Sequence, residues 1–218
     1  ATLAKRLKAM GNPRYQKDGP DGPGFGVTLD EDKVLEPLSW SRPRRVFVNS
    51  MSDLFHRDVP EDFVRRVFAT MAAAPRHQFQ VLTKRPRRMA ELVTRIVAEA
   101  GIAPNVWLGA SIEKDEYSWR ADYVRQTPAA VHFLSLEPLL GPLPSLDLEG
   151  IDWVIVGGES GPSARPCEIA WVREPRVMAG LAGAGFFFKQ WGGRTPKAGG
   201  RELDGRTWDD FPSRGGEE

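Results

Sequence analysis

Three carboxylates in this sequence occupy equivalent places, each shortly after an apolar run. Glu113 lies in GASIE, Glu137 in SLEP and Glu159 in GGES. Carboxylates that converge from neighbouring strands can perform general acid–base catalysis or bind an amino or hydroxyl group. The alternative for each is a structural ion pair; the candidate partners are Lys84, Lys189 and Arg165. The residues alone leave both interpretations open.

A basic turn follows another apolar run. Lys84 comes directly after Thr83, and Arg85, Arg87 and Arg88 lie in the turn that leads into a predicted helix. Helix N-termini favour anions, so a phosphate or carboxylate could bind here. The alternative is a solvated basic turn, which suits Arg87 and Arg88 better than Lys84.

Two further segments combine polar groups that could bind a polar ligand. One is Asn49-Ser50-Met51-Ser52-Asp53-Leu54-Phe55-His56, and the other is Lys189-Gln190-Trp191. The alternatives are a turn held by Asx and Ser bonds to the backbone, and a tryptophan that caps a barrel. No histidine shows metal-ligand spacing, and Cys167 is interpreted as an inert thiol.

The apolar runs that precede these groups predict the fold. They cover residues 46–48, 81–82, 106–108, 131–134, 154–156 and 186–188. Continuous apolar runs are typical of parallel strands buried on both faces, and the carboxyl ends of such strands share one functional edge. Helices are predicted from Pro60, from Pro86 to Gly101, and roughly over 115–126 and 172–183, with Pro175 in the first turn of the last one. The pattern therefore predicts an α/β fold, a partial TIM-type (βα) barrel of about six parallel strands.

Several segments depart from the repeat. A helix is predicted to end at Gly11 without a cap before Ala1, which favours a fragment, and residues 26–29 are predicted as a short strand. Too little chain separates 136 from 152 for a crossover helix, so we expect a loop or a small strand at Leu146–Leu148. A hairpin turn at Asp204-Gly205 divides the chain into an incomplete barrel domain, 1–192, and a C-terminal hairpin and tail, 193–218.

The charge balance, the cysteine count and the lengths of the apolar stretches limit the kinds of partner that this protein can have. The 218 residues include 30 basic and 29 acidic ones, a net charge of +1, and a single cysteine. Nucleic-acid contacts must then be local, and the basic cluster at 42–45 should lie at the opposite end of the sheet from the turn at 84–88. No apolar stretch reaches the roughly 20 residues of a membrane span, and no signal peptide is present, so we expect a cytoplasmic protein without membrane contact.

Six ordered motifs carry a family resemblance over essentially the whole chain. They are FVNSMSDLFH, FQVLTKRP, VWLGASIE, FLSLEPLLGP, WVIVGGESGPSARP and FFFKQWGG. In this order they resemble a family of phage-derived proteins of unknown function with a three-cysteine motif, related to radical S-adenosylmethionine enzymes. The resemblance implies a radical-SAM-like barrel. It also implies that this chain starts just after the cysteine motif.

The cofactors implied by the resemblance are S-adenosylmethionine and a [4Fe-4S] cluster, whose cysteine ligands are absent from this chain. The cofactor-binding residues carried over are Asn49, Ser50, Asp53, Lys84, Ser111, Glu113 and Gln190. The catalytic residues are Glu137, Glu159 and Lys189. By analogy with such barrels, Ser111 and Glu113 would bind the cofactor's ribose, and Lys84 its carboxylate.

These features support three hypotheses. The first is the barrel portion of a radical S-adenosylmethionine enzyme of unknown substrate, inactive as this chain alone, with a possible partner protein. The second is a non-catalytic, phage-associated binding module with local nucleic-acid contacts through residues 84–88. The third is a hydrolase or lyase that uses Glu137 and Glu159 without a cluster.

Overall fold

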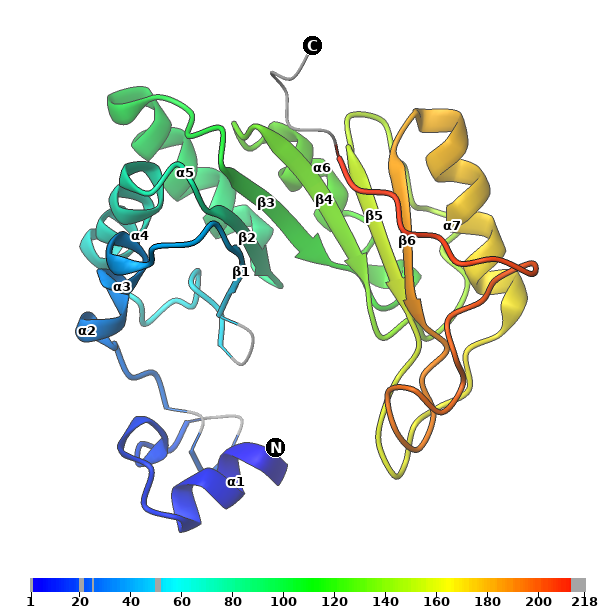
Figure 1. The fold of residues 1–218 in the computed structure, drawn as a ribbon, viewed down its shortest axis with the longest axis horizontal. Helices are drawn as coiled ribbons and strands as arrows, with labels where there is room; N and C mark the ends of the chain where they lie inside the picture. The colour runs from blue at the N-terminus through cyan, green and yellow to red at the C-terminus, as the bar shows by residue number, and fades with distance from the viewer. Residues whose placement is uncertain (1, 20–21, 25, 50–51, 213–218) are drawn as a thin grey trace.

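The computed structural model describes residues 2–19, 22–24, 26–49 and 52–212 (Figure 1). Six strands form one sheet in chain order, and each neighbouring pair is parallel. They are β1 (Arg45–Val48), β2 (Gln78–Thr83), β3 (Val106–Ser111), β4 (Val131–Leu136), β5 (Trp153–Gly157) and β6 (Gly185–Gln190). The sheet curls into a half-barrel (Figure 1), which confirms the predicted α/β architecture with six parallel strands.

Helices lie along the convex face of the sheet (Figure 1). They are α4 (Glu61–Ala73), α5 (Pro86–Ala100), α6 (Arg120–Gln126) and α7 (Ile169–Ala182). Each follows the carboxyl end of a strand and precedes the amino end of the next, so each helix begins at the carboxyl edge of the sheet. This is the βαβ arrangement expected of parallel strands.

The sequence explains the boundaries of the two longest predicted helices. Pro60 precedes α4, and Glu61 and Asp62 place negative charge at its positive end. In α5, Pro86 is the first residue and Gly101, with φ of 78°, ends the helix. The buried side chains of α5 include Met89, Leu92, Val93 and Ile96, at the spacing of one helix face. Each such side chain contributes about 1.5–3 kcal/mol by leaving water.

The inner face of the half-barrel is aromatic near the amino ends of the strands. Trp107, Phe133 and Trp153 point inward from β3, β4 and β5 and form a buried cluster with Val131. Gly109 makes room for one of these rings, because a Cβ at this position would lie 2.7 Å from the ring carbons of Phe133. Toward the carboxyl ends the inner face becomes polar.

Three expected elements differ from the structure. The predicted helix at 115–126 is a 3-10 turn, η2 (Asp115–Tyr117), followed by the separate α6. Helix α7 begins at Ile169, three residues earlier than expected, so Pro175 lies inside the helix and not in its first turn. Its missing N–H breaks the regular hydrogen-bond pattern there. Residues 26–29 form no strand, because no neighbouring backbone pairs with them as a ladder.

The connection from β4 to β5 is a loop, as one of the two sequence expectations had it. No strand forms at Leu146–Leu148. The loop covers this part of the convex face as the helices cover the rest, because it buries a row of side chains against the sheet. These are Leu139, Leu143, Leu146, Leu148 and Ile151. Apolar burial here depends on spacing in a loop and not on helical periodicity.

The C-terminal residues cover the free edge of β6. Asp204 and Gly205 form the predicted turn with φ of 55° and 78°. The backbone then pairs with β6: the Phe188 N–H donates to the Trp208 carbonyl at 3.0 Å. Phe211 ends against the inner aromatic cluster, 4.4 Å from the Trp153 ring centroid. The tail therefore protects a sheet edge that would otherwise be open to pairing with other chains.

The N-terminal residues form a small lobe beside the carboxyl end of β1 (Figure 1). It contains α1 (Thr2–Ala9), as expected, and the 3-10 turn η1 (Pro13–Tyr15). Two short helices, α2 (Glu31–Val34) and α3 (Glu36–Ser39), lead from it to β1. In the described part of the chain, no helix has the length and apolar character needed to cross a membrane.

Candidate functional site

Polar side chains meet at the carboxyl ends of β2, β3, β4 and β6, which we call the carboxyl rim. Its members are Lys84, Ser111, Glu113, Ser135, Glu137, Lys189 and Gln190. The register brings the strands together here, because Ser111 pairs with Ser135, and Gly157 with Gln190. Paired residues on neighbouring parallel strands point to the same face. Six of these seven residues were site candidates from the sequence; Ser135 was missed.

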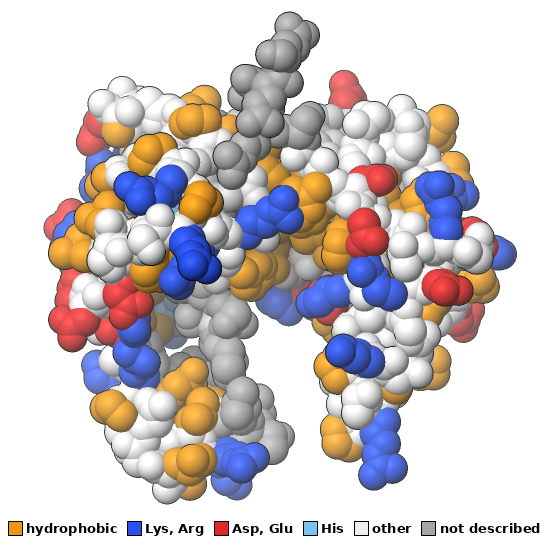
Figure 2. All heavy atoms as spheres, in the orientation of Figure 1, with side chains coloured by type: hydrophobic (Ala, Val, Ile, Leu, Met, Phe, Trp, Pro, Cys, Tyr) orange, Lys and Arg blue, Asp and Glu red, His pale blue; other side chains and the backbone are white. Residues whose placement is uncertain are grey.

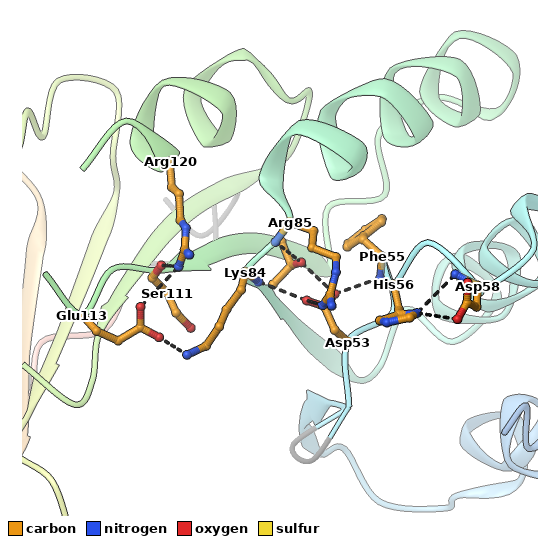
Figure 3. Close-up of polar contacts among 10 residues, drawn as sticks. Asp53, Phe55, His56, Asp58, Lys84, Arg85, Ser111, Glu113 and Arg120 are labelled. Carbon is orange, nitrogen blue, oxygen red and sulfur yellow. Dashed lines mark hydrogen bonds and ion pairs between the residues drawn. The ribbon is translucent and has the colours of Figure 1, made fainter. Parts of the chain in front are cut away.

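Glu113 lies between two cations at this rim (Figure 3). Its side chain is 8% exposed and forms ion pairs with Lys84 and Arg120. Arg120 is also buried and donates from Nη1 to the Ser111 carbonyl at 2.7 Å and to Glu113 Oε2 at 3.3 Å. The Lys84 side chain, in contrast, is 58% exposed. Glu113 is therefore held from beneath by a fixed arginine and from the solvent side by a lysine that can move away.

Sequence reasoning did not find Arg120, because it opens a helix and belongs to no strand-end motif. Its guanidinium lies 4.2 Å from the centre of the Tyr117 ring. Its Nε is buried without a hydrogen-bond partner. A nearly buried arginine needs a charged partner. A search for the partner of Glu113 is therefore the one approach that could have identified Arg120.

Asp53 connects the loop after β1 to the end of β2 (Figure 3). Its Oδ1 accepts from the Phe55 N–H at 2.9 Å and from Thr83 Oγ1 at 2.7 Å. Its Oδ2 accepts from the Lys84 N–H at 3.1 Å and from Arg85 Nη1 at 2.9 Å. Four donors occupy this carboxylate, so it positions Lys84 and has no lone pair directed at a ligand.

Ser111 and Ser135 place two hydroxyls side by side on the inner face. Both residues are nearly buried, with 5% and 6% of their surface exposed. Neither hydroxyl has a hydrogen-bond partner among the described residues, and their strands pair Ser111 directly with Ser135. Two adjacent free hydroxyls under a charged rim are suited to a ligand with polar atoms.

Glu137 faces Lys189 and Gln190 across β5. Lys189 Nζ donates to Glu137 Oε2 at 2.9 Å, and Gln190 Nε2 donates to Ser160 Oγ at 2.8 Å. Gly157 leaves space for this carboxylate, since a Cβ there would lie 3.2 Å from Glu137 Cδ. The Glu137 side chain is 21% exposed and Lys189 51% exposed, so this pair is open to solvent.

Glu159 forms its ion pair with an arginine of its own loop. Arg165 Nε donates to its Oε2 at 2.7 Å, and Arg165 Nη2 to its Oε1 at 2.8 Å. This fork lowers the pKa of Glu159 from 4.5 to about 2. A carboxylate that stays ionised cannot donate a proton near neutral pH. All three carboxylates thus form the ion pairs that the sequence offered as the alternative to catalysis, and Glu159 is the least suited to proton transfer.

The other predicted site residues, and the residues of the basic clusters other than Lys84, do not belong to the carboxyl rim. Asn49 is exposed with φ of 60°, and Ser50 lies outside the described residues. Within the basic turn, Arg87 Nε donates to Tyr123 Oη at 3.1 Å, and Arg88 donates to the carbonyl of Val59 at 2.7 Å. Because these guanidiniums already have partners, the turn offers little to an external phosphate. The basic cluster at 42–45 leads into the first residue of β1 and lies at the opposite edge of the sheet, as expected.

In the parts of the chain that the structure describes, no three His, Cys, Asp or Glu side chains are grouped to hold a metal ion. His77 and His132 form hydrogen bonds to the carbonyls of Pro37 and Thr127 at 3.0 and 2.7 Å. Burial raises the pKa of Cys167 to about 11, which disfavours the thiolate form that binds metals.

Comparison with known proteins gives a family match only. The family model described as "Protein of unknown function (DUF5131)" matches residues 1–212. No curated protein and no solved structure matches the chain.

Proposed function

The chain belongs to the DUF5131 family of unknown function, and on that premise we propose that its half-barrel is the ligand-binding portion of a radical S-adenosylmethionine enzyme of TIM type. The bound ligand in this proposal is S-adenosylmethionine, and the carboxyl rim is its site. The observation that carries the proposal is the mixed chemistry of that rim.

The rim offers a complementary group for each polar part of S-adenosylmethionine. The ligand has an ammonium, a carboxylate, a sulfonium, two ribose hydroxyls and a purine ring. Glu113 and Glu137 supply negative charge, and Lys84 supplies positive charge beside them. The free hydroxyls of Ser111 and Ser135 can bond to ribose or carboxylate oxygens. Polar groups placed above an apolar lining are the usual composition of a small-molecule site.

Lys84 has a specific place in this proposal. Its ammonium occupies the solvent side of Glu113, while Arg120 holds the other side. A ligand ammonium would displace Lys84, whose side chain is exposed, and would pair with the carboxylate that Arg120 keeps in position. The released Lys84 would then pair with the ligand carboxylate. The exchange keeps every charge partnered, which a buried site requires.

A [4Fe-4S] cluster does not fit the described residues. Three thiolate ligands are needed, and this chain has one cysteine whose thiol is held protonated by burial. No step of the proposal passes through the cluster for this reason. Three cysteines before Ala1 stay a prediction from the family resemblance.

The experiment that tests the proposal is calorimetric titration of the chain with S-adenosylmethionine, which needs no cluster. We expect a Kd of about 1–100 μM. Glu113→Gln should weaken binding at least about tenfold, because it removes the charge that receives the ammonium. The matched control is Glu61→Gln, which breaks ion pairs to Arg65 and Arg95 on the helical surface. Absence of binding at about 1 mM ligand, or equal affinities for the two variants, would refute the proposal.

A further inference from the structure

Two protrusions extend from the carboxyl edge of the sheet, on either side of the rim (Figure 1). The first, the N-terminal lobe, comprises the described residues of the segment 1–29, which are 2–19, 22–24 and 26–29. Its Val27 and Leu29 pack against the core, and a cleft of about 640 Å³ separates it from His56 and Pro60 after β1. The second, the finger, consists of the loops 158–168 and 191–201 after β5 and β6.

The two loops of the finger are locked together by backbone bonds. The Gly193 N–H donates to the Glu159 carbonyl at 2.8 Å, and the Gly161 N–H donates to the Gly193 carbonyl at 2.9 Å. The chains approach so closely that a Cβ at Gly158 would lie 1.9 Å from the Trp191 carbonyl oxygen. The finger is therefore a fixed projection that can present side chains at a defined position.

Positive charge is concentrated on these two protrusions. Residues 1–29 contain five basic and two acidic residues, a net charge of +3, and the 22 residues of the finger contain four basic and two acidic ones, a net charge of +2. Because the whole chain has a charge of +1, the remainder carries −4. Lys and Arg side chains are visible on both protrusions in Figure 2. The near-neutral total conceals a strong separation of charge.

Five of these cations are free to bind an anion. They are Lys5, Arg6, Lys17, Arg194 and Lys197, all of which are exposed. None of them forms an ion pair within the described residues, whereas Lys8, Arg14, Arg165 and Arg201 do. The exposed cations are available on both sides of the rim.

We propose that a single-stranded nucleic acid lies across the carboxyl edge, with its phosphates on the free cations of the N-terminal lobe and the finger. This substrate class rests on the proposed function, since it delivers a nucleotide to the rim. Six strands at ~4.8 Å spacing place roughly 24 Å of sheet between the two protrusions. One phosphate cannot bridge that span, but an extended polyanion can.

The inner face explains why the strand is single. The groups of the rim lie in the concavity, where Ser111 and Ser135 are nearly buried, so only an unpaired base can reach them. Phe187 and Ile155 are half-buried on the same face and offer apolar surface for stacking. A duplex would contact the protrusions alone.

The test is fluorescence anisotropy of the 218-residue chain with a labelled 20-nucleotide RNA, the same sequence as DNA, and the DNA duplex. The finger variant Arg194→Gln/Lys197→Gln should weaken single-strand binding about tenfold. It should also lower the slope of log Kd against log salt by about 1.4, or ~0.7 for each lost phosphate contact. The matched control is Arg42→Gln/Arg76→Gln, which removes two exposed cations at the amino edge and should change neither quantity.

Four results would overturn the inference. They are absence of single-strand binding, duplex affinity equal to that of the single strands, an unchanged salt slope in the finger variant, and an equal loss in the control variant. Calorimetry with S-adenosylmethionine separates this inference from the proposed function. If the ligand binds but nucleic acid does not, the inference alone fails; if nucleic acid binds but the ligand does not, the proposed function fails.

Discussion

Replacement of Asp53 by asparagine distinguishes a structural clamp from a ligand-binding group. The amide keeps one oxygen for the Phe55 N–H and the Thr83 hydroxyl, which now contact Oδ1. The other oxygen becomes an NH₂ group that faces two donors, the Lys84 N–H and Arg85. A donor placed against a donor removes both bonds and leaves a backbone N–H unsatisfied.

The expected cost follows from these contacts. A hydrogen bond to a charged group contributes about 1.5–3 kcal/mol, but the Lys84 N–H is at an exposed position, where water replaces part of the lost bond. Arg85 is 39% exposed and can turn to water, so its loss adds little. We therefore expect Asp53→Asn to lower the free energy of unfolding by about 1–2 kcal/mol. For a chain of this length, the melting temperature should fall by roughly 2–8 °C.

The assay is urea denaturation followed by tryptophan fluorescence, with calorimetry for the melting temperature. Asp58→Asn is the matched control, because its carboxylate is 58% exposed and lies 3.6 Å from Arg57; it should cost less than about 0.5 kcal/mol. If Asp53→Asn kept full stability but lost S-adenosylmethionine binding, Asp53 would be a ligand-binding group and the clamp argument would be wrong.

Three other variants test separate features. Phe211→Ala should lower the free energy of unfolding by about 2–3 kcal/mol in urea, because its ring packs on two inner tryptophans; a loss under about 0.5 kcal/mol would contradict docking of the tail. Arg165 lowers the pKa of Glu159 from 4.5 to about 2, so their pair stabilises the fold fully above pH 4.5 and is lost as the pH falls through 2. In Arg165→Ala, the carboxyl titration followed by NMR should move up toward 4.5. Gly158→Ala should cost about 3 kcal/mol by overpacking, while Gly180→Ala, with open space and helical geometry, should gain about 0.5–1 kcal/mol; equal thermal shifts would refute the close approach.

The strand and helix pattern could be predicted because it depends on local spacing. Pro86 and Gly101 bracket α5, and the apolar runs coincide with strands in all six cases. The start of α7 was missed because Pro175 argues locally for a first turn, whereas the helix begins at Ile169 and Trp171 in the added turn packs against the core. In this helix, the packing of side chains against the core outweighs the local preference of Pro175 for a first turn.

The sequence could predict which residues lie at the site, but not which ion pairs they form. That Glu113, Glu137 and Lys84 share one edge follows from the parallel topology. That Glu159 bonds to Arg165 while Glu113 bonds to the buried Arg120 depends on side-chain directions, which no spacing rule supplies. Ser135 ends an apolar run in the sequence but was not chosen as a site residue, because only the structure places it beside Ser111.

The common direction of the helices gives the molecule an electric dipole. Helices α4, α5, α6 and α7 all begin at the carboxyl edge, so their positive ends point the same way as the basic protrusions. Their negative ends lie at the amino edge of the sheet. Arg42 and Arg44 come just before β1 and Arg76 just before β2, so these three cations lie at the same edge. An approaching anion is therefore turned toward one end of the molecule before any contact forms, and this orientation weakens as the Debye length shortens with added salt.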